Sequence, residues 1–295
     1  KIGADFLKKI NPNAKVLISD PSWENHRALF SNAGFLVETY IYYDAGKRGV
    51  NFDGMLASLK AAVPGTIVVL HACCHNPTGY DITPAQWDQV VEAVRAGRLI
   101  AFLDMAYQGF GHGIAEDGAV IGKFVDAGLN FFVSSSFSKS FSLYGERVGA
   151  LSVVCSGKEE TARVLSQLKI TIRTNYSNPP THGAAVVAAV LNTPELRQQW
   201  EQELGVMRAR IKQMREKLVE GLKAAGVQRD MSFITQQIGM FSYSGLSKDQ
   251  MVRLRSEFGV YGTDSGRMCV AAINKKNIAY VCEAMAKVLD ATVAA

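Results

Sequence analysis

The chain has 295 residues, of which 48% are hydrophobic and 20% are charged, and this composition excludes a disordered or fibrous protein. Lysines and arginines number 32 against 27 acidic residues, a net charge of +5 that is scattered along the chain, which disfavours nucleic-acid binding. No apolar run approaches the roughly 20 residues that span a bilayer, and no secretory leader opens the sequence, so we expect a cytoplasmic protein. Five cysteines without a CxxC pair indicate reduced thiols and neither a disulfide framework nor a zinc ribbon.

The first residues already show helical spacing. Ile2, Phe6, Leu7 and Ile10 recur as on one helix face, and no N-cap residue precedes them. We therefore expect the sequence to begin inside a helix and an N-terminal segment to be missing from it.

Short β-branched or aromatic runs then alternate with longer amphipathic stretches, which predicts βα units and a mostly parallel sheet. The expected strands lie at residues 15–19, 36–43, 66–71, 99–104, 130–135 and 150–154. The expected helices lie at residues 23–33, 52–61, 84–96, 159–172 and 183–191. The strands at 66–71 and 99–104 are almost continuously apolar, as in strands buried on both faces.

A long helix is predicted over 194–225, because its apolar residues step by three and four, with Thr193 as the expected N-cap and Pro194 in the first turn. After it we expect a strand pair (from Phe233, then 239–243), a helix at 248–258, a strand at 267–272 and a final helix from 276. This order predicts a large domain over 1–205 and a small α+β domain over 206–295, linked by the long helix.

Polar residues follow the expected buried strands at 71–79, 104–107 and 134–139, which is where ligands bind in open α/β sheets. Lys139 comes after an apolar strand and three serines, with Phe141 and Leu143 just beyond it. A partly apolar pocket would lower the pKa of its amine and allow a Schiff base, although a surface lysine would fit the residue taken alone.

Asp104 closes a buried strand, so its carboxylate needs a cationic or hydrogen-bonding partner. It is either an N-cap or turn aspartate, or the partner of a protonated ring nitrogen in a cofactor. Tyr107 is either an ordinary half-buried packing residue, or its hydroxyl reaches a phenolic oxygen of the same cofactor. The sequence also contains three candidate arginines, Arg147, Arg173 and Arg267. Each one taken alone fits an ordinary surface residue. Together with Lys139, Asp104 and Tyr107 they describe a site for a phosphorylated ring and a substrate that bears carboxylates.

Two other chemistries compete for these residues. His71 and His75 flank two cysteines, which suggests a metal site, but the chain has no second ligand cluster and we do not expect a metal. Ser136 and Lys139 fit the SxxK motif of serine acyl-enzyme hydrolases, and Tyr176-Ser-Asn178 resembles a second motif of that class. The third motif, KTG or KSG, is absent from the sequence, which disfavours this hydrolase.

With these motifs together, the sequence resembles the aspartate and aromatic amino-acid aminotransferases, which are fold type I enzymes dependent on pyridoxal 5'-phosphate (PLP). That resemblance implies an α/β fold with a mostly parallel central sheet flanked by helices, and a smaller α+β C-terminal domain. It covers essentially the whole chain in order and is carried by the segments 21–26, 74–79, 104–110, 136–139, 145–149, 173–180 and 266–267.

The resemblance also implies a role for each cofactor-binding residue. Lys139 would form the Schiff base with PLP and move the proton, while Asp104 would keep the ring nitrogen protonated. The other cofactor contacts would be Asn76 and Tyr107 on the ring 3'-oxygen, Trp23 on the ring face, Ser136 and Arg147 on the phosphate, and His26 and His71 behind Asp104.

On the substrate side, the resemblance assigns the α-carboxylate to Arg267, beside Asn76 and Trp23. It implies a homodimer in which Arg173 reaches the partner's site and pairs with a dicarboxylic side chain. The reaction would be reversible transfer of an amino group between an aromatic or dicarboxylic L-amino acid and 2-oxoglutarate, in two half-reactions. Residues 141–149 and 265–270 look more like the bacterial aromatic (tyrosine) branch, with a strict aspartate aminotransferase as the alternative. His75 and His182 match no functional position.

Overall fold

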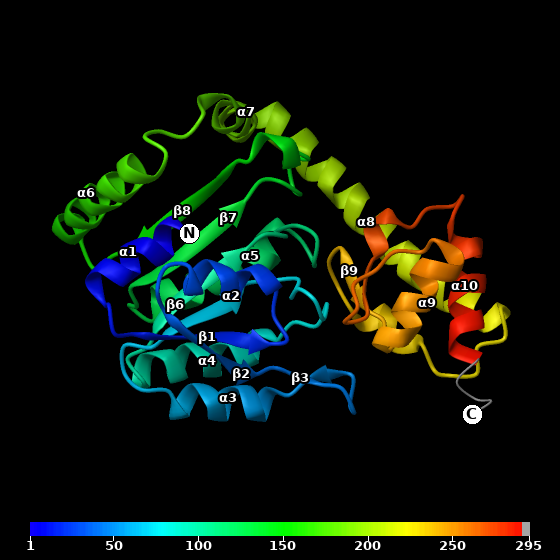
Figure 1. Cartoon of the computed structure of the whole chain (residues 1–295). Coiled ribbons are helices and arrows are strands. Elements are labelled where there is room, and N and C mark those ends of the chain that lie inside the picture. Colours follow the sequence, from blue (N-terminus) through cyan, green and yellow to red (C-terminus); the bar gives the residue numbers. More distant parts are fainter. Residues whose placement is uncertain (291–295) are drawn as a thin grey trace.

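The computed structural model describes residues 1–290 and is built around a six-stranded sheet of order β2-β1-β5-β6-β7-β8 (Figure 1). Neighbouring strands are parallel except at the β7–β8 edge, which is antiparallel. This confirms the predicted mostly parallel sheet. The strands are β1 (Lys15–Asp20), β2 (Leu36–Ile41), β5 (Ile67–His71), β6 (Ile100–Met105), β7 (Phe131–Ser136) and β8 (Gly149–Val154).

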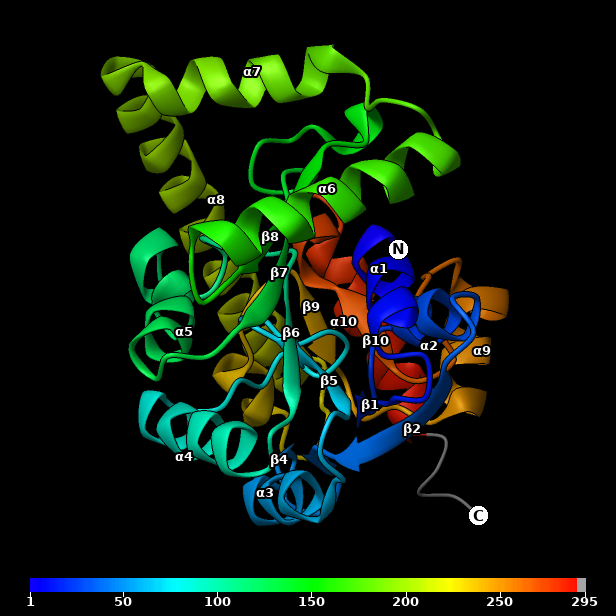
Figure 2. The same ribbon diagram turned by 90° about the vertical axis from the view of Figure 1, so that its left-hand side faces the viewer.

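Side chains alternate between the two faces of this sheet, and each face packs into its own apolar cluster. In β1, Val16 and Ile18 join one cluster, whereas Leu17 joins the other. Helices cover both faces, as Figure 2 shows end-on. The cluster that contains Val16 and Ile18 includes residues of α1 (Ile2–Ile10), α2 (Glu24–Ser31) and α6 (Lys158–Asn175). The cluster that contains Leu17 includes residues of α3 (Phe52–Ala61), α4 (Pro84–Ala96) and α5 (Ile114–Asp126).

Helix α5 was not predicted. Gly118 and Gly122 lie within it and Gly113 is its N-cap, so the local sequence has weak helix propensity and the helix depends on packing. Buried Val120 and Phe124 supply that packing against the core. The expected strand at 36–43 is also divided: β2 ends at Ile41, and a short β3 (Tyr43–Asp44) pairs instead with β4 (Gly49–Val50).

The long helix predicted over 194–225 is present as α8 (Pro194–Ala224), and beyond α7 (Thr181–Asn192) it runs from the sheet to a smaller group of elements (Figure 1). That group contains β9 (Phe241–Tyr243), antiparallel to β10 (Arg267–Cys269), and the helices α9 (Lys248–Phe258) and α10 (Ile278–Asp290). We propose the boundary between the two domains near residue 205, within α8.

Two strand predictions in this region are wrong. The strand expected from Phe233 is a 3-10 helix, η2 (Ser232–Gln236), and the strand expected at 267–272 ends at Cys269 and turns into η3 (Val270–Ala272). Thr193 is the N-cap of α8, as predicted, although its side chain makes no capping hydrogen bond. Within the described residues, no helix has the length and apolar character needed to cross a membrane.

Candidate active site

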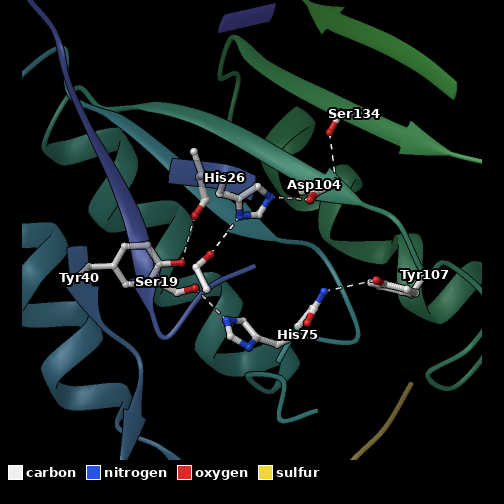
Figure 3. Close-up of polar contacts among 10 residues, drawn as sticks. Ser19, His26, Tyr40, His75, Asp104, Tyr107 and Ser134 are labelled. Carbon is white, nitrogen blue, oxygen red and sulfur yellow. Dashed lines mark hydrogen bonds and ion pairs between the residues drawn. The ribbon is translucent and has the colours of Figure 1, made fainter. Parts of the chain in front are cut away.

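The strand register brings three predicted polar residues to one edge of the sheet. Asp104 on β6 lies between His71 on β5 and Ser134 on β7 in the pairing register. Because these strands are parallel, their carboxyl ends meet at the same edge, where ligands bind in such sheets. Figure 3 shows Asp104, His26 and Ser134 meeting there.

Asp104 is held by a short hydrogen bond from helix α2. His26 Nε2 donates to Asp104 Oδ2 at 2.6 Å, and Ser134 Oγ donates to Asp104 Oδ1 at 3.3 Å. Burial acts to raise the pKa of the carboxyl, but the interaction with His26 and the hydrogen bond from Ser134 outweigh it and hold the pKa below its usual value. Asp104 is therefore an ionised carboxylate at neutral pH.

A column of rings continues behind this pair. His71 lies 4.8 Å from the His26 ring and 4.2 Å from the His75 ring, and His75 stacks on Tyr42 at 4.0 Å. Burial lowers the pKa values of both His71 and His75 well below normal, so both are neutral. Neither ring nitrogen of His71 has a hydrogen-bond partner among residues 1–290.

Lys139 lies on the other side of the same edge. Its Nζ is 4.9 Å from the centre of the Tyr107 ring, and burial lowers the pKa of its amine, opposed by Asp104 and assisted by Arg147. The structure thus brings together the amine, the carboxylate and the phenol that the sequence predicted.

Asn76 links Tyr107 to the smaller group of elements. Asn76 Nδ2 lies 3.4 Å from Tyr107 Oη, and Arg267 Nη1 donates to Asn76 Oδ1 at 2.9 Å. Arg267 also lies over the Phe241 ring at 4.6 Å. Its guanidinium is therefore positioned beside the same edge from a distant part of the chain.

The β7–β8 hairpin brings Ser136 and Arg147 to one place. Ser136 pairs with Gly149 across the hairpin, and Phe137 N donates to Val148 O at 3.2 Å. Arg147 is exposed, has a left-handed backbone conformation (φ 54°) and donates from Nη1 to Tyr144 O at 2.7 Å. The Ser136 hydroxyl and the Arg147 guanidinium therefore lie near Lys139, where together they could bind an anion.

Trp23 and Arg173 differ in their placement. Trp23 lies at the start of α2, edge-on to the His26 ring at 5.3 Å, with 37% of its surface exposed. Arg173, near the end of α6, is exposed and donates a hydrogen bond to Ser177 Oγ. This contact does not involve the residues at the sheet edge described above.

Asp81 is a residue of this region that the sequence analysis missed. Its carboxylate accepts hydrogen bonds from the backbone of Cys74 (2.6 Å) and His75 (2.8 Å), directly before Asn76. Burial raises the pKa of Asp81 to about 6, against those two hydrogen bonds. An acidic residue closing the Asn-Pro-Thr-Gly turn was the available signal, since such residues bind backbone N–H groups in turns.

Comparisons with known proteins agree with this geometry. Residues 1–285 match the family model described as aminotransferase class I and II. A relative from Pseudomonas aeruginosa, named aspartate aminotransferase, is 61% identical over 98% of this chain and 73% of its own length. The aromatic-amino-acid aminotransferase of Escherichia coli is 54% identical over the same shares.

A solved structure is also similar throughout. It is the aromatic-amino-acid aminotransferase from Burkholderia pseudomallei covalently bound to pyridoxal phosphate, with 67% identity and a TM-score of 0.95. The match covers 98% of this chain and 72% of that one.

Proposed function

This chain belongs to the aminotransferase class I and II family and is a PLP-dependent aminotransferase, and from that premise we propose how its own residues perform the reaction. We infer that it moves an amino group reversibly between an aromatic or dicarboxylic L-amino acid and 2-oxoglutarate. The observation that carries the assignment is the meeting of an ionised Asp104 with the Lys139 amine at one sheet edge.

The residues present fit the cofactor. An ionised, buried carboxylate suits a protonated ring nitrogen, an amine of lowered pKa suits a Schiff base, and the Arg147–Ser136 hairpin suits a phosphate group. The exposed Trp23 ring suits stacking on a flat ring. When bound, PLP supplies an electron sink for the charge that develops at the substrate Cα.

The chain supplies orientation and proton movement. Arg267, fixed by Asn76, binds the substrate α-carboxylate and so sets the direction of the Cα–H bond. Lys139 Nζ, with its lowered pKa, would take the proton from Cα as a general base and deliver it, as the conjugate acid, to C4' of the bound cofactor. His26 keeps Asp104 ionised, while His71 packs behind that pair as a neutral ring.

We propose that the enzyme acts as a homodimer in which Arg173 binds the side-chain carboxylate of a dicarboxylic substrate in the partner's site. The support is that several large apolar side chains are exposed on α6 and the neighbouring loops, namely Leu165, Ile170, Tyr144 and Tyr176. Sedimentation measurements test the dimer, and a monomer at micromolar concentration would contradict it. We place the protein in the cytoplasm, because its five cysteines are free thiols.

The relatives are named for two substrate classes, aspartate and aromatic amino acids, and the solved structure with 67% identity carries the aromatic name. We propose the aromatic branch, with aspartate also accepted. Comparing kcat/KM for tyrosine, phenylalanine and aspartate, each with 2-oxoglutarate, tests this. Activity confined to aspartate would indicate the strict branch.

The test of the function itself uses absorption. Adding PLP to the protein is expected to produce a new near-ultraviolet or visible band that borohydride removes. Lys139→Ala should lose both the band and transamination, whereas the exposed Lys276→Ala should keep both. Normal transamination by Lys139→Ala would refute the assignment, and covalent labelling by penicillin would favour the SxxK hydrolase instead.

A further inference from the structure

A cavity lies away from the active-site residues discussed above. It has a volume of about 510 Å³ and is bounded by the loop 110–112 after β6, the middle of α8 and the segment 235–239. It therefore sits where α8 leaves the sheet for the smaller group of elements (Figure 1). No residue assigned above to PLP or substrate lines it.

The lining is strongly cationic. Arg208, Lys212 and Arg215 contribute to it, and their spacing of four and three places them on one face of α8. No carboxylate side chain is among the lining residues, and His112 adds a titratable ring. The carboxylate of Asp117, in the helix that follows this loop, accepts hydrogen bonds from the backbone N–H groups of 109, 111 and 112 at 2.8–2.9 Å.

Arg208 is pre-positioned at this cavity. Its Nη1 donates to Gly109 O at 2.7 Å. Its Nη2 lies 3.7 Å from the point where a Cβ on Gly205 would stand, and Gly205 itself lines the cavity. The absence of a side chain at 205 therefore keeps the space beside this guanidinium open.

Arg215 is the least explained residue of the lining. It is only 2% exposed, and its Nη2 donates to Gly239 O (2.8 Å) and Phe241 O (2.5 Å). Its Nη1 has no partner among residues 1–290, and burial lowers the pKa of the guanidinium to about 10. Buried charges in proteins are normally paired, so a cation of this kind is stabilised by an anion nearby.

We propose that this cavity is a binding site for a phosphate group, either free or carried by a small metabolite, held by Arg208 and Lys212 with Arg215 beneath them. A dianionic oxyanion matches a lining of three cations, and guanidinium groups suit its geometry. The cavity exceeds a bare phosphate ion in size, which leaves room for an attached organic group.

Ligand binding there has a direct route to the active site. Ile238, which lines the cavity, donates its N–H to Gly79 O at 2.8 Å. Gly239, also in the lining, lies so close to Cys74 that a Cβ on it would come within 2.7 Å of the Cys74 Cβ. Both contacts are to the loop that carries Asn76, so an anion that orders 235–239 also orders that loop.

The experiment uses the PLP-loaded enzyme, so that the phosphate position of the active site is already filled. Calorimetric titrations at constant ionic strength use inorganic phosphate in one arm and glycerol 3-phosphate in the other. Both ligands are expected to bind saturably, and tighter binding of the second would identify a phosphorylated metabolite as the ligand.

The double variant Arg208→Gln/Lys212→Gln should weaken this affinity by about tenfold or more, since both changes remove cationic contacts. The control Lys217→Gln removes one charge from the same helix outside the lining and should leave the affinity unchanged. Transamination without added phosphate should be normal in all three proteins, which separates this test from that of the catalytic assignment. Equal affinity in the double variant, or no saturable binding by the unmodified enzyme, would overturn the proposal.

Discussion

Gly79 offers a quantitative test of how the active-site loop is held. It has φ +72°, and a Cβ placed on it would lie 2.9 Å from Gln237 Cβ and 3.2 Å from Phe241 O. An alanine there would carry left-handed backbone strain of about 1–2 kcal/mol. Overpacking against the 237–241 segment should add about 1–3 kcal/mol.

Gly128 is the matched control, because it has φ +67° and nothing within 4 Å of its Cβ position. Gly128→Ala should therefore show the backbone strain alone, about 1–2 kcal/mol, whereas Gly79→Ala should cost about 2–5 kcal/mol. The measurement is the free energy of unfolding in urea, at one PLP concentration for both variants.

The same substitution should also affect substrate binding. The loop that contains Gly79 presents Asn76, which fixes Arg267 through a 2.9 Å hydrogen bond. Gly79→Ala should raise KM for the amino acid, and Gly128→Ala should not. Equal destabilisation by the two variants would refute the close approach at residue 79, and an unchanged KM would refute its link to Arg267.

Three further predictions concern carboxylates of the active site and the loops beside it. Asp104→Ala should weaken PLP binding and lower kcat by more than about 100-fold, because an unprotonated ring nitrogen withdraws little charge. Absorbance titration measures the PLP binding, and steady-state rates measure kcat. Because the pKa of Asp81 is raised to about 6 in the folded protein, its protonated carboxyl stabilises the fold. This contribution is complete below about pH 3.8 and is lost as the pH rises through about 6. Asp81→Asn should therefore flatten the pH dependence of the free energy of unfolding over that range. Asp117→Ala leaves three loop N–H groups without their acceptor and should lower the free energy of unfolding by about 3 kcal/mol or more, measured in urea.

Local signals in the sequence were sufficient for most of the fold. The strand cores and the helices α3, α4 and α9 were predicted to within a residue or two, because their apolar periodicity agrees with their burial and start signals mark the helices. Helix α5 was missed, since its glycines suppress the local signal and only contacts with the core stabilise it. The segment at 232–236 was taken for a strand because its short apolar run has no decisive period.

Much of the candidate site could also be predicted, because parallel strands place their carboxyl ends at one edge. That rule brings residues on different strands together, such as Asp104 and Ser134. It does not reveal contacts that depend on the path of a loop. Arg215 binds the carbonyl of Gly239, a backbone group that no sequence motif marks. Asp81 binds the backbone of Cys74 and His75, and its place at the end of the Asn-Pro-Thr-Gly turn was only a weak signal of this contact.

The charge of Asp104 illustrates this limit most clearly. The sequence names two histidines that support it, His26 and His71, and gives them equivalent roles. In the structure only His26 donates a hydrogen bond to the carboxylate, whereas the buried His71 ring has no partner for either nitrogen among residues 1–290. Burial and the neighbouring rings of His26 and His75 disfavour a proton on His71, so it cannot supply the second positive charge that a symmetric pair would provide. The ionised state of Asp104 thus depends mainly on one 2.6 Å hydrogen bond, and His71 contributes by occupying the space behind it.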